Sequence, residues 1–116
     1  MAYSKKFEFS DRDLTLAEWC RAMSHPARIA IVRALAERGE CVCGDLVFDL
    51  PLAQSTVSQH LKALKEAGII RGEIDGVKSW YCLDQAGFRR FMRAHLAFQK
   101  QLDSLIAKSS EASRDC

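Results

Sequence analysis

The stretch that decides the fold is Gln54-Ser55-Thr56-Val57-Ser58-Gln59-His60-Leu61-Lys62-Ala63-Leu64-Lys65-Glu66-Ala67-Gly68, which has the spacing of an amphipathic helix. At about 100° of rotation per residue, Val57, Leu61 and Leu64 fall on one narrow stripe. Small polar and basic residues gather on the opposite side: Ser55, Ser58, Gln59 and Lys62. Small polar residues compete with the helix backbone and are scarce on ordinary solvated faces. They suit a helix that reads DNA, because Gln pairs with an adenine edge while Ser, Thr and Lys reach bases or phosphates.

The segments on either side of this reading helix predict a winged helix-turn-helix. Upstream, residues 44–50 predict a short helix that Pro51 ends, so a tight turn leads into the reading helix. Downstream, residues 69–74 and 77–83 predict two strands around the turn Asp75-Gly76, a strong hairpin signal. A hairpin that directly follows a reading helix is a wing.

Two helices and a strand are predicted before this unit, and one long helix after it. Residues 11–24 have helical spacing, and Pro26 opens a second helix that Gly39 ends. Residues 40–43 predict a brief strand, and Asp84 caps a long final helix. The predicted fold class is therefore mostly α with a small β-wing (α+β), in the order helix, helix, strand, helix, helix, strand, strand, helix.

Length and composition allow one compact domain, since the chain has 116 residues of which 48% are hydrophobic. We expect this domain at residues 11–107, between a flexible arm (1–10) and a flexible tail (108–116). The net charge of only +2 means that any basic surface is local. No apolar run could span a bilayer and residues 1–10 do not form a secretory signal, so we expect a cytoplasmic protein without a membrane partner. The sequence contains neither a nucleophile elbow nor a phosphate loop, so we do not expect an enzyme.

The candidate DNA contacts lie on the reading helix and on the wing. Arg71 and Lys78 stand on the two sides of the hairpin and are candidates for phosphate contact. His60 lies at the flank of the apolar stripe, so it either packs inside the protein or contacts DNA. The alternative for the whole face is ordinary solvation. The candidate residues on the reading helix are Gln54, Ser55, Thr56, Ser58, Gln59, His60, Lys62 and Lys65.

Five cysteines in a chain of this kind favour thiols, metal ligands or redox sensors over a disulfide scaffold. Cys41 and Cys43, two residues apart on a strand, point to one face about 6.5–7 Å apart, which suits two ligands of one soft ion and suits a direct disulfide poorly. The strand pairs with the second wing strand, which brings Cys82 near. The three thiols are a candidate site for arsenite or antimonite.

Two alternatives for these cysteines stay open. Free cysteine behaves as a small hydrophobe, so Cys41 and Cys43 could instead fill core positions. Alternation along the wing strand would then bury Tyr81 and Leu83 and turn Cys82 outward. A redox or persulfide switch between two distant cysteines is a second choice for the signal, with Cys20 as one partner.

The chain resembles the ArsR/SmtB family of metal- and thiol-responsive repressors over about residues 14–106. The likeness lies in Ser24-His25-Pro26-Ala27-Arg28, in the string from Leu52 to Leu64, and in Gly68-Ile69-Ile70. It implies a homodimeric repressor that binds palindromic double-stranded operator DNA, with no obligatory cofactor or protein partner, and with reading helices about 34 Å apart. In that family the first and last helices form the dimer interface, which here implies Leu16, Trp19, Phe88, Phe91, Met92 and Leu96.

The cysteines depart from the family pattern. Arsenic-responsive members similar to this chain carry a Cys-x-Cys pair directly before Asp-Leu, whereas Gly44 intervenes here, so the ligand set does not carry over intact. Zinc-type sensors use paired Asp and His on the last helix, where this chain has only His95 and Asp103, and a zinc site there is not expected. A winged helix without metal or thiol input, and a protein- or RNA-binding module on the same fold, remain rival hypotheses.

Overall fold

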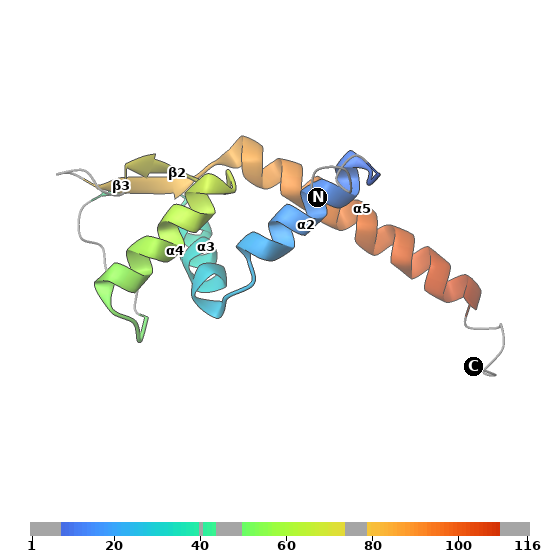
Figure 1. The fold of residues 1–116 in the computed structure, drawn as a ribbon, viewed down its shortest axis with the longest axis horizontal. Coiled ribbons are helices and arrows are strands. Elements are labelled where there is room, and N and C mark those ends of the chain that lie inside the picture. Colours follow the sequence, from blue (N-terminus) through green and yellow to red (C-terminus); the bar gives the residue numbers. More distant parts are fainter. Residues whose placement is uncertain (1–7, 40, 44–49, 74–78, 110–116) are drawn as a thin grey trace.

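The computed structural model of the chain describes residues 8–39, 41–43, 50–73 and 79–109 (Figure 1). In these residues the structure contains four helices and one antiparallel sheet of strand order β1-β3-β2. This arrangement confirms the predicted winged helix-turn-helix. The elements are α2 (Asp11–Ala22), α3 (Pro26–Arg38), β1 (Val42–Cys43), α4 (Gln54–Glu66), β2 (Ile70–Glu73), β3 (Trp80–Leu83) and α5 (Gln85–Ser109).

Some predicted features lie outside the described residues. They are most of the short helix at 44–50, the turn at Asp75-Gly76, Lys78, most of the N-terminal arm and most of the C-terminal tail. Among the described helices, none is both long enough and apolar enough to cross a membrane.

The helix ends follow from local hydrogen bonds that the sequence largely anticipates. Pro26 occupies the first turn of α3, and Gly39 ends that helix in the left-handed conformation with φ of 72°. The carboxylate of Asp84 accepts a hydrogen bond from the Gly87 N–H at 3.0 Å, which is the predicted cap of α5. Two boundaries differ from the expected ones: α2 ends at Ala22 rather than near Ser24, and α5 continues to Ser109.

The core lies where α3, α4, the sheet and the start of α5 meet. The apolar stripe of the reading helix, Val57, Leu61 and Leu64, is buried there as predicted. Because this stripe faces inward, α4 is oriented with its polar side toward solvent. The largest fully buried side chains are Phe91, Ile31, Leu35, Leu64, Ile69 and Ile70.

Two glycines allow backbones to approach closely. Gly72 has φ of 147°, and a Cβ there would collide with the backbone of Trp80 and Tyr81 on the neighbouring strand. A Cβ on Gly87 would collide with the carbonyl of Gly68, at the turn after α4. The Asp84 N–H also donates to the Ile69 carbonyl at 2.9 Å. The first turn of α5 is therefore fastened directly to the end of the reading helix.

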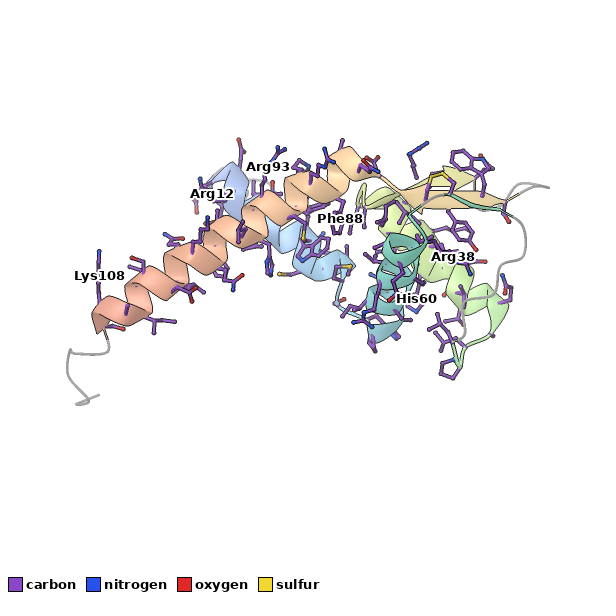
Figure 2. The ribbon with its side chains drawn as sticks, turned by 180° about the vertical axis from the view of Figure 1, so that it is seen from behind. Arg12, Arg38, His60, Phe88, Arg93 and Lys108 are labelled. Carbon is purple, nitrogen blue, oxygen red and sulfur yellow. A yellow bond between two sulfur atoms is a disulfide. The ribbon has the colours of Figure 1, made fainter. Side chains whose placement is uncertain are left out.

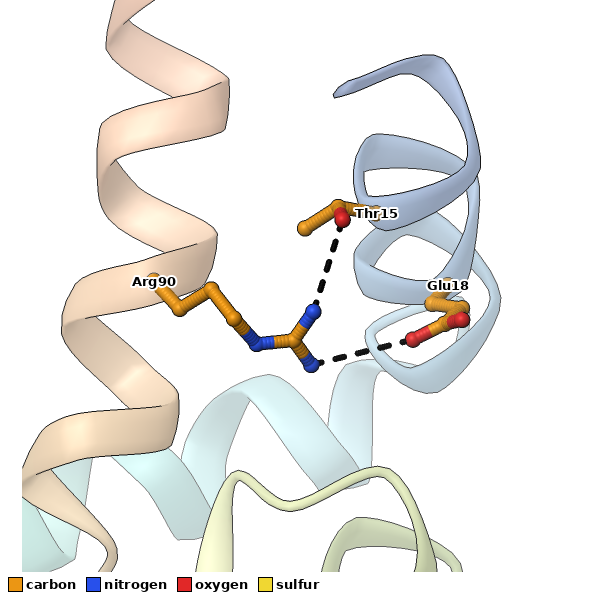
Figure 3. Close-up of polar contacts among 3 residues, drawn as sticks. All are labelled: Thr15, Glu18 and Arg90. Atoms are coloured by element: carbon orange, nitrogen blue, oxygen red, sulfur yellow. Dashed lines mark hydrogen bonds and ion pairs between the residues drawn. The ribbon is translucent and has the colours of Figure 1, made fainter. Parts of the chain in front are cut away.

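The α2–α5 contact depends on aromatic packing. The Trp19 ring lies 5.9 Å from the Phe88 ring and 5.5 Å from the Phe91 ring, measured between centroids. Arg90 reaches from α5 to α2, where it donates to the Thr15 hydroxyl at 3.4 Å and pairs with Glu18 at 3.8 Å (Figure 3). These polar groups are about half exposed, so the rings contribute more to the stability of this contact.

Phe91 was expected at a dimer interface, and the structure corrects this. Its side chain is 0% exposed and belongs to the core of the single chain. The reason is geometric: Phe88 and Phe91 are one helical turn apart, so both face Trp19, and only the more central of the two is fully enclosed.

The second half of α5 extends away from the rest of the protein (Figure 1). The chain measures 59 × 34 × 25 Å and has a radius of gyration of 17.9 Å. A compact domain of about 100 residues has a value of about 13 Å. This half of α5 carries large apolar side chains that the single chain does not cover, namely Leu96, Phe98, Leu102, Leu105 and Ile106.

Candidate DNA-binding surface and cysteine pair

The polar side of α4 forms an open surface beside the wing. Because Val57, Leu61 and Leu64 are buried, the residues on the other side of the helix face solvent. Contact of these residues with DNA stays a prediction, but their exposure meets its first requirement. Gln54, Ser55, Gln59, Lys62 and Lys65 are exposed, and Thr56 and Ser58 are partly exposed.

His60 does not belong to this surface, which corrects its place among the DNA contacts. The side chain is only 9% exposed, and its Nδ1 accepts a hydrogen bond from Arg28 Nε at 3.1 Å. Its ring lies 4.4 Å from the His25 ring (Figure 2 labels His60). The reason is its position one turn from both Val57 and Leu64, on the buried side of the helix. Of the two alternatives left open for His60, packing is the one realised.

The surroundings of His60 disfavour its charged form. Burial is the largest cause that lowers the pKa of His60, and the nearby His25 and Arg28 lower it further. The acceptor role of Nδ1 toward Arg28 also requires a neutral ring, because an imidazolium has no free lone pair. His60 is therefore a neutral acceptor at neutral pH.

Arg71 lies on the exposed face of the wing. Its guanidinium carbon is 5.8 Å from the centroid of the Trp80 ring on the neighbouring strand, within cation–π range. The strand register places Arg71 opposite Cys82. Trp80 was not among the predicted site residues; it is exposed, and Arg71 lies over its ring.

Cys41 and Cys82 form a disulfide, with their Cα atoms 4.3 Å apart. The cysteines were expected to be thiols, metal ligands or redox sensors rather than a disulfide scaffold, and in this pair the free-thiol alternative is not the one observed. The β1–β3 register explains it: Val42 pairs with Tyr81 and Cys43 with Trp80, so Cys41 comes opposite Cys82. The predicted neighbourhood of Cys82 and the cysteine strand is thus confirmed.

Cys82 is also buried, at 5% exposure, although alternation next to the core residue Tyr81 would turn it outward. Cys41, its disulfide partner, covers Cys82 on the face of the sheet opposite the core. A cleft of about 610 Å³ opens beside the disulfide, between the end of α3 and the start of α5, and Arg71 contributes to its wall. The pair is therefore accessible from one side.

No metal site is complete within the described side chains. There, no three His, Cys, Asp or Glu residues converge on a common point. The side chain of Cys43, the third expected ligand, and the whole of Cys116 lie outside the described part. Cys20 is described, and it is exposed and free. What the structure brings together is a pair of cysteines, Cys41 and Cys82.

Comparisons with known proteins agree with this geometry. The profile of the family described as bacterial regulatory protein, arsR family, matches residues 25–71, from the start of α3 into the wing. The transcriptional repressor SmtB of Mycobacterium tuberculosis is 48% identical over 66 residues, which cover 57% of this chain and 48% of SmtB. The chain thus spans about half the length of that relative.

Two further relatives match over more of their length. The transcriptional regulator Rv2034 of Mycobacterium tuberculosis is 35% identical over 92 residues, covering 72% of this chain and 85% of the relative. A homolog of the cadmium resistance regulatory protein CadC from Staphylococcus aureus is 27% identical over 103 residues, covering 88% of this chain and 84% of the relative. These relatives are regulators and not enzymes, as expected. The chain belongs to the arsR family of bacterial regulatory proteins.

Proposed function

We propose that this protein is a DNA-binding transcriptional repressor whose affinity for its operator is controlled at the Cys41–Cys82 pair. One observation carries the DNA-binding part: the reading helix buries its apolar stripe and exposes Gln, Ser and Lys side chains beside a wing. Family membership supports the same conclusion.

The proposed contacts divide into base reading and backbone positioning. The major groove admits one helix, and Gln59, in the middle of the exposed face, can make two hydrogen bonds to an adenine edge. Lys62 and Lys65 follow on the same helix, and Arg71 on the wing supplies a further positive charge. Charges of this kind bind phosphates and position the protein without specifying sequence.

A homodimer would bury the uncovered apolar residues of α5. Four of them, Phe98, Leu102, Leu105 and Ile106, lie on one side of the helix within about 100° of each other, and a stripe of exposed apolar side chains favours an intermolecular contact that removes it from water. Leu105 and Ile106 are 52% and 60% exposed. Two-fold pairing would place the reading helices in successive major grooves, about 34 Å apart. The surface proposed consists of that stripe together with Leu96, Leu16, Trp19, Phe88 and Met92, the last four being partly exposed.

The proposed inducer is trivalent arsenic or antimony bound to the reduced cysteines. Thiolates are preferred ligands of soft ions, and Cys41 and Cys82 already lie side by side. Cys43 is proposed as the third ligand, since it lies in β1, two residues after Cys41 in the chain. The name of the CadC homolog connects that relative with cadmium, another thiophilic ion. No obligatory cofactor is proposed.

The route from this site to DNA runs through α5. Cys82 is two residues from Asp84, which caps α5 and donates its N–H to Ile69 just after the reading helix. A ligand that moves Cys82 therefore acts on a segment attached to α4. Release from DNA then follows if the liganded form favours a dimer whose reading helices are wrongly spaced.

Oxidation is a second candidate signal, favoured by the observed pairing of Cys41 with Cys82. In this reaction the two thiols lose two protons and two electrons to an oxidant such as hydrogen peroxide, and the sulfur–sulfur bond forms. The disulfide then joins β1 to β3 covalently. This candidate replaces the distant pair with Cys20 that the sequence suggested.

Gln59→Ala tests base reading. We expect it to weaken binding to the preferred operator by about 1–3 kcal/mol and to relax specificity at one or two base pairs only. The measurement is fluorescence anisotropy with a duplex selected by the wild-type protein from a random pool, and with single-base variants of it. Gln101→Ala on α5 is the matched control. Equal loss on every duplex would contradict base reading by Gln59.

Leu105→Asp combined with Ile106→Asp tests the dimer. Two carboxylates in an apolar interface must be desolvated, so we expect the protein to sediment as a monomer and to lose operator affinity. Ser104→Asp, which adds a charge on another side of the same helix, should sediment like wild type. A wild-type protein that is itself monomeric at micromolar concentration would refute the proposed dimer.

Cys41→Ser tests the inducer site, with the protein kept reduced. We expect arsenite to release wild type and Cys20→Ser from the duplex, and to leave Cys41→Ser and Cys82→Ser bound, because each of these two substitutions removes one of the three proposed thiolate ligands. Release of Cys41→Ser at the wild-type arsenite concentration would eliminate this site.

Alkylation with iodoacetamide tests the redox candidate. After peroxide treatment we expect Cys20 to be alkylated, while Cys41 and Cys82 become reactive only after reduction; peptide mass mapping provides the measurement. The same oxidised sample is then titrated with operator. Oxidised protein that binds as tightly as reduced protein would show that the disulfide is structural and carries no signal.

A further inference from the structure

Two sequence motifs that are far apart along the chain meet at one hydrogen bond. Arg28, from the string that opens α3, donates from Nε to Nδ1 of His60 in the reading helix, at 3.1 Å. The two residues are 32 positions apart. His25, from the same string as Arg28, places its ring 4.4 Å from the His60 ring. The start of α3 therefore contacts the middle of the reading helix with both a polar and a ring contact.

Arg28 is itself held in place by a second helix. Its Nη1 donates to the carbonyl of Ala22 at 3.2 Å and approaches the carbonyl of Arg21 at 3.5 Å, at the end of α2. Carbonyls at a helix end have no partner within the helix, so a guanidinium satisfies them well. One side chain thus joins the end of α2, the start of α3 and the middle of α4.

We infer that the Arg28–His60 hydrogen bond positions the reading helix for DNA, and that protonation of His60 breaks it and releases the helix from that position. His60 lies next to the exposed Gln59 in the chain, so a change in its anchor acts on the proposed base-reading residue. The part of this inference that concerns DNA binding rests on the proposed function. His60 is a positioning residue and does not touch DNA.

Protonation removes the bond for two reasons. An imidazolium donates from both nitrogens, so Nδ1 loses the lone pair that Arg28 needs. The new cation also faces the Arg28 guanidinium, in a site that is mostly screened from water. The described charged or titratable groups in contact with His60 are Arg28 and His25, both from the start of α3. Neither can compensate a positive charge on His60.

The expected pH window lies on the acidic side. Burial, then His25 and Arg28, lower the pKa of His60 from its usual value of 6.5. The native state therefore binds the proton more weakly than the unfolded chain does. The stabilising contribution is complete above pH 6.5 and is lost as the pH falls below that value.

The test uses two substitutions of His60 with the full-length protein. In His60→Asn the side-chain oxygen can take the place of Nδ1 and accept from Arg28, but it does not titrate. In His60→Leu the acceptor is lost. Anisotropy with the selected duplex is measured from about pH 8 to about pH 5.5, the range in which histidine titrates. His95→Asn, at an exposed position on α5, is the matched control.

We expect wild type and His95→Asn to lose about tenfold in affinity across this range, and His60→Asn to lose much less. His60→Leu should bind about tenfold more weakly than wild type already at about pH 8. An identical acid loss in His60→Asn and wild type would overturn the inference. So would wild-type affinity of His60→Leu at about pH 8 in a folded protein. If wild type binds no duplex selectively, the proposed function is refuted, together with the part of the inference that concerns DNA binding.

A second measurement examines the contact without DNA. In nitrogen-15 spectra of the free protein, we expect the Arg28 Nε–H signal to be protected from exchange in wild type and His60→Asn. It should disappear in His60→Leu, and in wild type at the pH at which the His60 ring titrates. An Arg28 signal that is unchanged by His60→Leu, or by titration of His60, would overturn the inference independently of the affinity data.

Discussion

Burial of one apolar stripe on α4 is the constraint on which the rest of the structure depends. Val57, Leu61 and Leu64 must leave water, and they do so against α3 and the sheet. Once these residues are buried, the regular pitch of the helix determines which way its opposite side faces. The polar side of α4 then faces solvent beside the wing. His60, at the edge of the apolar stripe, packs against the start of α3. The DNA-binding proposal and the histidine contact thus have a common origin.

The sequence was sufficient for features that depend on neighbours along the chain. Helical spacing predicted α4 and α5, and Gly39 and Asp84 mark helix ends because a cap involves residues within one turn. The side of α4 that faces solvent was predicted for the same reason. The fold followed from the order of these local elements, and it agrees with the family to which the chain belongs.

Contacts between distant segments were less accessible to sequence reasoning. The disulfide joins residues 41 positions apart, and it depends on a strand register that no local pattern fixes. The partner of His60 lies 32 positions away. Phe91 was assigned to a dimer surface because the family resemblance implies an interface on the first and last helices, and the helical spacing of α5 does not divide its apolar residues between core and interface. The structure makes that division: Phe91 is enclosed by its own chain, whereas Leu105 and Ile106 are not.

The backbones of Gly68 and Gly87 are in direct contact, which couples the end of α4 to the start of α5. No side chain separates the backbones there, so no rotamer change can absorb a displacement of one helix against the other. From Gly87 to Ser109, 22 rises of about 1.5 Å make the part of α5 beyond this contact about 33 Å long. A small tilt of α5 at this contact therefore becomes a large displacement at its far end. In the proposed dimer, a partner bound at the far end of α5 would therefore act on the angle of the reading helix.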